Sequence, residues 1–400
     1  MKRPELLAPA GDFEKMKTAI HYGADAVYLG DPRFSLRNKA KNFDAEELAA
    51  AISYAHERGV RVYLTVNIFA RSSDLPDISD HIVLLRGICP DAVIISDPGV
   101  FMMFREKAPE IDIHVSTQAN ITNAAAARFW ENMGAKRLII ARELSIDEIR
   151  EINECTGVEL EAFVHGAVCL SYSGKCYLSS YMASRSANAG ECTNSCRWKY
   201  ALVEEKRPGQ YLPVYEDDRG AYVMNSRDLC LIDHLQLLRD AGIDSFKIEG
   251  RMKGIHYAAG VTRTYREAID LIDENEKYQS KLPGWHKELS LFGNRGYTTG
   301  LLFGKGEGLY NYSENSRSQE SEVVGVIVDV NGTLSKVRLR RKVSIGDALE
   351  YLTPGLEERV FSVESLRHED GIGAVSANAG DVVLISTPEG PRKGDLVRRR

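Results

Sequence analysis

Cysteines concentrated in one short segment are the first residues of this chain whose types and spacing could do chemistry. Cys169, Cys176, Cys192 and Cys196 follow the spacing C-x6-C-x15-C-x3-C, and Cys230 comes after 33 further residues. This is neither the paired C-x2-C pattern of zinc ribbons nor the usual ferredoxin run. Crowded thiolates are nevertheless the ligands that zinc and iron–sulfur centres prefer. The segment predicts a soft-metal centre; a zinc site without catalysis and, less expected in the cytosol, a disulfide stay open as alternatives.

Polar and ionisable side chains follow the ends of many of the predicted strands. They are Asn67, Ser96, Asp97, Thr117, Gln118, Asn120, Arg142, Glu143, His165, Glu249 and Arg251, with Lys247 inside the last strand. In a parallel barrel these side chains meet at one mouth, which is where the active sites of such barrels lie. Single members also have structural explanations, such as a helix cap at Asp97 or an ion pair between Lys247 and Glu249.

The cationic members of this set indicate an anionic ligand. Arg142, Lys247 and Arg251 together suit a carboxylate or a phosphate held by several donors. His165, beside the cysteine segment, suits proton transfer. We therefore predict two groups of site residues. The catalytic group is His165, Lys247 and Glu249, and the substrate-binding group is Asn67, Gln118, Arg142 and Arg251.

A second basic feature lies near the end of the chain. Lys336, Arg338 and Arg340 alternate along one predicted strand, and the chain ends Arg398-Arg399-Arg400. Period-two alternation puts the first three side chains on one face of the strand. The net charge of -6 does not exclude nucleic acid, because a local patch can supply the phosphate contacts. We predict an RNA-binding surface on Lys336, Arg338 and Arg340, with a solvated or charge-protected edge strand as the structural alternative.

The elements that must position these residues alternate regularly over the first 250 residues. Short apolar strands are expected at 5–8, 26–29, 61–66, 92–95, 113–116, 137–141, 160–164 and 245–248. Helices between them start at Asp44 and Ser145, each with Glu three positions later, and glycines stop helices before the next strand. This alternation predicts a (β/α)8 TIM-like barrel over residues 1–315, although strand count alone does not exclude an open doubly wound sheet.

The alternation breaks after His165. A long cysteine-rich insertion is expected at about residues 166–225, and long loops of this kind are usually functional. A helix start is then expected at 225–228 and one long helix at 256–277. From 320 to 400 the hydrophobic pattern has period two, with Asn331-Gly332 and Pro354-Gly355 as turn signals. This predicts a small C-terminal all-β barrel, the candidate RNA-binding domain.

Composition narrows the class of protein. With 44% hydrophobic and 27% charged residues, the chain has an ordinary globular composition rather than that of a disordered or fibrous protein. We expect no signal peptide, no membrane partner and a cytoplasmic location, because no apolar run has the required length. The sequence contains no H-E-x-x-H, no G-x-S-x-G and no P-loop, which argues against the zincin, α/β-hydrolase and P-loop classes.

Several segments together resemble the peptidase U-32 family, also called the collagenase-like protease family. They are PELLAPAGDFEKMKTAIHYGADAVYLG (4–30), HVSTQANITN (114–123), HGAVCLSYSGKCYLSSY (165–181), GECTNSCRWKY (190–200) and FKIEGRMK (246–253). The resemblance covers nearly the whole chain, and its most specific parts are the cysteine segments and FKIEGRMK. Within the family, the chain resembles most the tRNA hydroxylation proteins that form 5-hydroxyuridine.

The resemblance implies a cofactor, a reaction and a partner. It implies a 4Fe–4S cluster on Cys169, Cys176, Cys192 and Cys196, with Cys230 as the alternative fourth ligand. It also implies oxygen-independent hydroxylation of the wobble uridine of tRNA, with prephenate as the hydroxyl source. tRNA is then the partner, and a related family subunit is a second candidate partner. A collagenase-like, metal-dependent peptidase and a non-catalytic RNA-binding or assembly protein with a structural metal are the competing interpretations.

Overall fold

The chain forms two compact units in a computed structural model. The barrel unit comprises residues 1–16, 25–252 and 294–317, and the C-terminal unit comprises residues 17–24, 253–293 and 318–400. The structure describes residues 2–36, 41–169, 171–176, 178–197, 202–203, 211–212, 216–217, 220–221, 226–304, 321–388 and 390–399. Most residues of the second half of the expected insertion, from 198 to 225, therefore lie outside the described residues.

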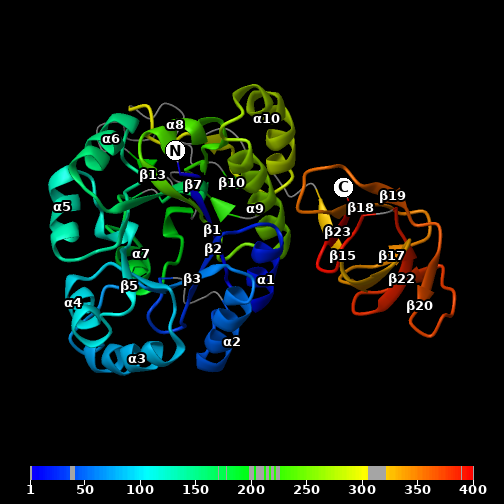
Figure 1. Ribbon diagram of the computed structural model, residues 1–400, viewed down its shortest axis with the longest axis horizontal. Coiled ribbons are helices and arrows are strands. Elements are labelled where there is room, and N and C mark those ends of the chain that lie inside the picture. Colours follow the sequence, from blue (N-terminus) through cyan, green and yellow to red (C-terminus); the bar gives the residue numbers. More distant parts are fainter. Residues whose placement is uncertain are drawn as a thin grey trace. The chain divides into compact units, whose positions relative to one another are not determined.

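Eight parallel strands close into a barrel, which confirms the predicted fold and excludes the open sheet. They are β1 (Glu5–Pro9), β2 (Ala26–Gly30), β3 (Arg61–Val66), β4 (Ala92–Ile95), β5 (Asp112–Val115), β6 (Arg137–Ile139), β7 (Glu159–Ala167) and β13 (Ile243–Ile248). Closure comes from β13, which pairs with β1 on one side and with β7 on the other (Figure 1). Every residue of β4 is buried, as its continuous apolar run requires of a strand covered on both faces.

Helices follow the strands and lie outside the ring (Figure 1). They are α1 (Phe13–His21), α2 (Ala45–His56), α3 (Leu75–Ile88), α4 (Pro98–Lys107), α5 (Ala124–Asn132), α6 (Ile146–Cys155) and α8 (Leu235–Asp240). The predicted helix starts are confirmed, because Asp44 and Ser145 each form a complete capping box. Gly134 and Gly242 end their helices with φ of 94° and 98°, which few other residues adopt.

The insertion is more structured than the long loop that was expected. Its described part contains α7 (Leu178–Ala183) and the 3-10 turns η2 (Ala187–Ala189) and η3 (Ser195–Arg197). Two-residue strands follow at β8 (Leu202–Val203), β9 (Tyr211–Leu212), β10 (Glu216–Asp217) and β11 (Gly220–Ala221). The predicted helix start at 225–228 is wrong. The strand β12 (Asp228–Cys230) lies there instead, because it pairs antiparallel with the last residues of the long strand β7.

Two short elements complete the barrel unit. The turn η4 (Ile232–His234) joins β12 to α8, and β14 (Tyr297–Thr298) pairs in parallel with β12. Through this pairing, residues far along the chain are added to the sheet beside the end of β7. The mouth of the barrel is therefore bordered by segments that no local pattern would bring there.

The C-terminal unit contains two helices where one was expected. The helix predicted at 256–277 is wrong, because α9 (Ile255–Asp270) ends at a turn and α10 (Asn275–Ser290) begins after it. Gly260 in α9 allows close packing, since a Cβ there would lie 1.9 Å from the ring of Phe292. No described helix of either unit combines the length and the apolar composition that a membrane crossing requires.

The all-β part of the C-terminal unit is confirmed as an antiparallel sheet. Its strands are β15 (Glu322–Asn331), β16 (Leu334–Leu339), β17 (Val343–Ser344), β18 (Ala348–Leu352), β19 (Val360–Ser362), β20 (Leu366–His368), β21 (Ser376–Ala377), β22 (Val382–Ser386) and β23 (Leu396–Arg399). The main sheet has the order β19-β18-β23-β15-β16-β22-β20, and β17 pairs with β21. Its core is a cluster of buried aliphatic and aromatic residues that alternate with exposed ones.

Candidate functional site

The carboxyl ends of the barrel strands surround a pocket, which we call the mouth pocket. It has a volume of about 520 Å³, including space open to solvent. It is lined by Tyr28, Leu36, Thr65, Asn67, Ile94, Ser116, Thr117, Gln118, Ile139, Arg142, Phe163, Cys169, Lys247, Glu249 and Arg251. The structure thus brings together Asn67, Gln118, Arg142, Lys247, Glu249 and Arg251 from the predicted site.

Arg251 is a rigid cation in the wall of this pocket. It is only 3% exposed, and its guanidinium donates to the Thr65 hydroxyl at 3.0 Å and to the Ser35 hydroxyl at 2.5 Å. The end of β2 makes room for it, because a Cβ at Gly30 would lie 2.2 Å from a guanidinium nitrogen. Two hydroxyls and a glycine thus fix the orientation of Arg251 before any ligand binds.

Lys247 is a second basic side chain in the wall of the mouth pocket. Its ammonium is buried and donates to Glu161 Oε1 at 2.7 Å, and it lies 4.5 Å from the ring centroid of Tyr28. Burial lowers the pKa of Lys247 below its usual range, while the Glu161 carboxylate opposes that effect. The ion pair therefore favours the charged form of Lys247 against the effect of burial on its pKa.

An ionic network continues from Lys247 into the barrel interior, and it was not predicted from the sequence. Arg137 contacts Glu161 at 3.2 Å and Glu5 at 2.6 Å, and Glu5 accepts a hydrogen bond from the Tyr63 hydroxyl at 2.7 Å. Burial and the nearby Glu5 raise the pKa of Tyr63, so its hydroxyl stays a donor. Ionisable residues within otherwise apolar strands were the available sequence signal for this network.

Amides and a carboxylate complete the mouth pocket. The Asn67 side chain accepts from the Leu36 amide at 3.3 Å and donates to the Ser116 hydroxyl at 3.4 Å. The Gln118 side chain lines the pocket, while its backbone N–H donates to Ser116. Glu249 accepts from the Tyr28 hydroxyl at 3.4 Å. The pocket thus combines three cationic side chains with one carboxylate, which favours a ligand that carries negative charge.

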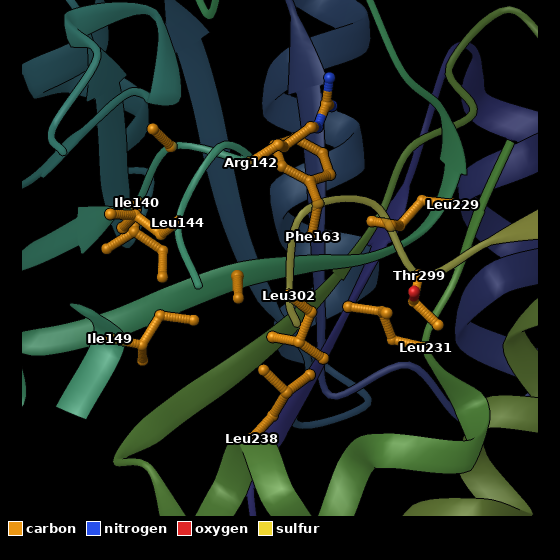
Figure 2. Close-up of a pocket in the computed structure, with 12 residues that line it drawn as sticks. Ile140, Arg142, Leu144, Ile149, Phe163, Leu229, Leu231, Leu238, Thr299 and Leu302 are labelled. Atoms are coloured by element: carbon orange, nitrogen blue, oxygen red, sulfur yellow. The ribbon is translucent and has the colours of Figure 1, made fainter. Parts of the chain in front are cut away.

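Arg142 stands between the mouth pocket and two further hollows. Its guanidinium stacks on the ring of Phe163, 3.9 Å from the centroid. Figure 2 shows this pair beside a small apolar pocket that includes Leu144, Leu229 and Leu302. The stacked ring restricts the guanidinium to one orientation, so Arg142 is also positioned in advance.

The second hollow, which we call the insertion pocket, has a volume of about 760 Å³, including space open to solvent. It is lined by Arg142, Glu143, Val168, Cys169, Ser171, Tyr172, Ser226, Arg227, Leu229, Thr298, Gly300 and Leu301. Glu143 anchors the insertion here, because its carboxylate accepts from the backbone N–H of Ser173 at 2.9 Å. The close approach also requires Gly174, where a Cβ would lie 2.2 Å from the Gln118 carbonyl oxygen.

His165 is set apart from the other predicted site residues. It is 2% exposed in β7, and its ring lies 5.4 Å from the ring of Tyr297. Among the described residues it does not line the mouth pocket, although its backbone carbonyl accepts from the N–H of Glu249 at 2.9 Å. Its role in proton transfer therefore stays a prediction.

The predicted metal ligands differ in their exposure. Cys169 is exposed at the rim shared by the mouth and insertion pockets, while Cys176, Cys192 and Cys196 are partly exposed. Cys230 is buried in β12. In the described part of the chain no three His, Cys, Asp or Glu side chains are grouped as metal ligands. The thiol chemistry fits a soft metal, but the described positions of these cysteines do not form a ready site.

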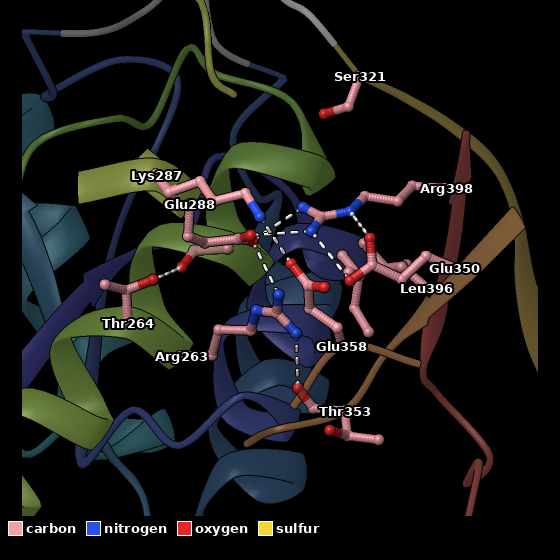
Figure 3. A network of polar contacts seen from close by, with 12 residues as sticks. Arg263, Thr264, Lys287, Glu288, Ser321, Glu350, Thr353, Glu358, Leu396 and Arg398 are labelled. Carbon is pink, nitrogen blue, oxygen red and sulfur yellow. Dashed lines mark hydrogen bonds and ion pairs between the residues drawn. The ribbon is translucent and has the colours of Figure 1, made fainter. Parts of the chain in front are cut away.

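The basic residues of the C-terminal unit fall into two sets. Lys336 and Arg338 lie on the outward face of β16, as the period-two pattern predicted, and Arg340 directly follows the strand. Arg338 and Arg340 are exposed, while Lys336 pairs with Glu369. The edge-strand alternative is wrong, because β16 pairs with β15 on one side and β22 on the other. Arg398 is not part of this surface. It is fully buried between Glu288 and Glu350 (Figure 3).

Models of one protein family match nearly the whole chain. The model of Peptidase family U32 matches residues 11–311, and that of the Peptidase family U32 C-terminal domain matches residues 319–398. The tRNA hydroxylation protein P of Escherichia coli is 39% identical over 97% of this chain and 95% of its own length. The tRNA hydroxylation protein P1 of Bacillus subtilis is 37% identical over 92% of this chain and 88% of its own length. A protein of Porphyromonas gingivalis named collagenase is 32% identical over 99% of this chain and 97% of its own length. The chain therefore belongs to peptidase family U32.

Proposed function

We propose that this protein is an enzyme that hydroxylates tRNA, converting the wobble uridine to 5-hydroxyuridine without molecular oxygen. Two similar proteins that cover nearly the whole chain are named tRNA hydroxylation proteins. The observation that carries the proposal is the mouth pocket, in which Arg142, Lys247 and Arg251 converge at the end of the barrel where such enzymes react. A barrel mouth with fixed cations suits an enzyme better than a passive scaffold.

The anionic ligand of the mouth pocket is, in this proposal, the hydroxyl source. Replacing the C5 hydrogen of uracil by a hydroxyl group oxidises the base by two electrons, so an oxygen donor and an electron acceptor are both needed. Prephenate carries two carboxylates, and Arg142, Arg251 and Lys247 could hold them through charge-assisted hydrogen bonds. Asn67 and Gln118 would bind the neutral part of the ligand, and Glu249 and His165 are the candidates for proton transfer.

The cofactor in this proposal is a 4Fe–4S cluster on Cys169, Cys176, Cys192 and Cys196, with Cys230 as the alternative fourth ligand. When bound, such a cluster supplies electron transfer at a potential set by its surroundings. Binding requires the insertion to draw these thiols together, so the metal and the local fold would be coupled. Anaerobic purification with iron and sulfide quantified tests this, and zinc without sulfide would contradict it.

tRNA is the proposed macromolecular partner, bound in part by Lys336 and Arg338 on β16 and by Arg340 just after it. A related family subunit is a second proposed partner, which co-purification of tagged protein from its native cells would detect. A mass consistent with the single chain, together with full activity of the purified chain, would argue against that subunit.

The proposed function is tested with purified protein under anaerobic conditions. We expect the protein to add one oxygen atom per modified uridine when it is given prephenate, an added dye that accepts two electrons, and tRNA from cells that lack its gene, as measured by mass spectrometry of nucleosides. Gelatin is the parallel substrate, because one relative is named collagenase. Gelatin cleavage that Arg251→Met abolishes, with unmodified tRNA, would replace the hydroxylase by a peptidase.

A further inference from the structure

The insertion pocket differs chemically from the mouth pocket beside it. Its inner wall includes the apolar side chains of Val168, Leu229 and Leu301, and polar groups lie around these. A volume of about 760 Å³, including open space, lies within the roughly 300–1,000 Å³ range of small-molecule sites. Apolar faces bordered by hydrogen-bonding groups suit a flat heterocycle rather than a small, highly charged anion.

Arg227 gives a second, independent sign of a ligand in this pocket. Its Nε atom is buried and has no hydrogen-bond partner among the described residues, although the side chain lines the pocket. Buried donors without a partner are rare in folded proteins, and such groups often mark the place of an unseen acceptor. A rotation of the Arg227 side chain, which lines the pocket, would bring this donor to a carbonyl oxygen there. Both carbonyl groups of uracil are acceptors of this kind.

The rim of the pocket carries an aromatic side chain in an unusual position. Tyr172 is 66% exposed although it lines the pocket. Exposed aromatic rings are stacking platforms for bases of single-stranded nucleic acid. Enzymes that act on a base inside RNA or DNA take it out of its stack and enclose it in a separate pocket. Tyr172 lies where the extruded nucleotide or its neighbour would enter.

Arg142 and Cys169 connect the two pockets, because both line each of them. A ligand in the insertion pocket and an anion in the mouth pocket would therefore meet at the Arg142 side chain. The stacked position of Arg142 on Phe163 keeps its guanidinium available at this boundary. A base and an anionic oxygen donor can react only when they are held close together. Binding them on either side of the Arg142 guanidinium would do this.

We propose that the insertion pocket receives a single extruded uracil base of the RNA substrate. In this arrangement Arg227 donates to a base carbonyl, Tyr172 stacks at the entrance, and Arg142 faces both the base and the anion. The inference rests on the proposed function and adds to it the place where the reacting base binds. It assigns binding roles to Tyr172 and Arg227, neither of which was predicted from the sequence.

Photocrosslinking tests the pocket without relying on activity. RNA that carries 4-thiouridine at the target position is bound to the full-length protein and irradiated, and the crosslinked peptides are identified by mass spectrometry. We expect crosslinks in peptides that contain Tyr172 or Arg227, and their loss in Arg227→Met and Tyr172→Ala. The matched controls are Arg185→Met and Tyr181→Ala, because both residues are exposed in the insertion and do not line the pocket.

Kinetics give the second readout. We expect Arg227→Met to lower kcat about 10-fold or more while the Kd for whole tRNA changes about 2-fold, because most of the affinity comes from phosphate contacts. Arg185→Met removes the same charge and should leave kcat unchanged. Tyr172→Phe should recover the kcat that Tyr172→Ala loses, since stacking needs only the ring. Thermal melting confirms that each variant is folded.

The outcomes separate this inference from the proposed function. Crosslinks confined to other peptides, or unchanged crosslinking in Arg227→Met and Tyr172→Ala, would overturn the pocket assignment even if the wild-type protein hydroxylates tRNA. Crosslinks in the pocket without any hydroxylation would keep the base-binding site and reject the reaction. Equal losses in Arg227→Met and Arg185→Met would assign Arg227 to a phosphate and overturn its contact with the base.

Discussion

Lys247 and Glu161 form the most informative pair of residues in the barrel. The ammonium of Lys247 is buried, and the Glu161 carboxylate that holds it is 0% exposed. Because burial already lowers the pKa of Lys247, removal of the carboxylate must lower it further. The positive charge of Lys247 in the wall of the mouth pocket would then disappear at a lower pH.

The Glu161→Gln variant tests this dependence. We expect the alkaline limb of kcat/KM for the anionic co-substrate to move to lower pH, since the variant loses its cation earlier as pH rises. Breaking a buried pair also costs about 3–5 kcal/mol of stability, which urea denaturation measures. Adding Lys247→Met to the variant removes the uncompensated amine and should recover part of that stability. An alkaline limb that stays in place would contradict the role of the pair.

Arg251 leads to a prediction about geometry rather than charge. Its guanidinium donates to both Thr65 and Ser35, and a lysine ammonium cannot reproduce that planar arrangement. We expect Arg251→Lys to lower kcat/KM for hydroxylation by about 10- to 100-fold while iron content and folding stay unchanged. The control is Arg86→Lys, because Arg86 is exposed and pairs only with Glu110 in the described contacts. Equal activity of Arg251→Lys and the wild type would remove Arg251 from the site.

At the scale of elements, β16 presents the proposed contact with the tRNA backbone. Replacing Lys336, Arg338 and Arg340 by Gln should weaken tRNA binding and reduce the slope of log K against log salt by about 0.7–0.9 for each phosphate that is no longer neutralised. Filter binding over a range of salt concentrations measures this slope. The control variant replaces three exposed arginines on or directly after barrel helices, Arg58, Arg86 and Arg150. The same slope change in both variants would mean that the contact is not specific to β16.

The barrel elements could be predicted because their signals are local. Apolar runs such as Val93-Ile94-Ile95 give buried strands, and the capping boxes at Asp44 and Ser145 fix helix starts within four residues. The mouth pocket followed from the same reasoning, since residues after parallel strands must meet at one end. Asn67, Lys247 and Arg251 thus reach one pocket from strands far apart in the sequence.

The elements that could not be predicted depend on long-range pairing. Cys230 lies in β12 only because β7 extends beyond its neighbours and offers it an edge at His165. Glu5, Arg137 and Glu161 lie on three different strands and meet only after the barrel closes. The break between α9 and α10 near Leu271 contains neither Gly nor Pro, so no local stop signal was present.

At the scale of the whole molecule, a buried ionic network within the C-terminal unit links stability to pH. Glu288 accepts from Arg398 at 2.8 Å and from Arg263 at 2.9 Å (Figure 3). Burial raises the pKa of Glu288, but the two arginines outweigh it and lower the pKa from 4.5 to about 2. Burial likewise lowers the pKa of His256 from 6.5 to about 3. In both cases the unfolded state binds more protons than the folded state at mildly acidic pH.

We expect the free energy of unfolding of this unit to fall as the pH falls from 6.5 to 2. His256 lowers the free energy of unfolding as the pH falls from 6.5 to 3, and Glu288 lowers it as the pH falls from 4.5 to 2. Each contributes up to about 1.4 kcal/mol per pH unit. Urea denaturation followed by Trp285 fluorescence, in a Trp130→Phe, Trp198→Phe background, measures this. Glu288→Gln should flatten the profile below pH 4.5 and His256→Phe should flatten it above that value. Unchanged profiles would show that other groups control acid unfolding.

The proposed tRNA hydroxylation at the barrel mouth can be tested in cells by nucleoside mass spectrometry of their tRNA. tRNA is isolated from cells that lack the gene and express either the wild-type protein, Arg251→Lys or Arg86→Lys at equal levels. We predict that the wild type and Arg86→Lys restore a uridine that carries one additional oxygen atom, while Arg251→Lys restores little. Absence of that nucleoside with the wild-type protein, or its full restoration by Arg251→Lys, would contradict the account.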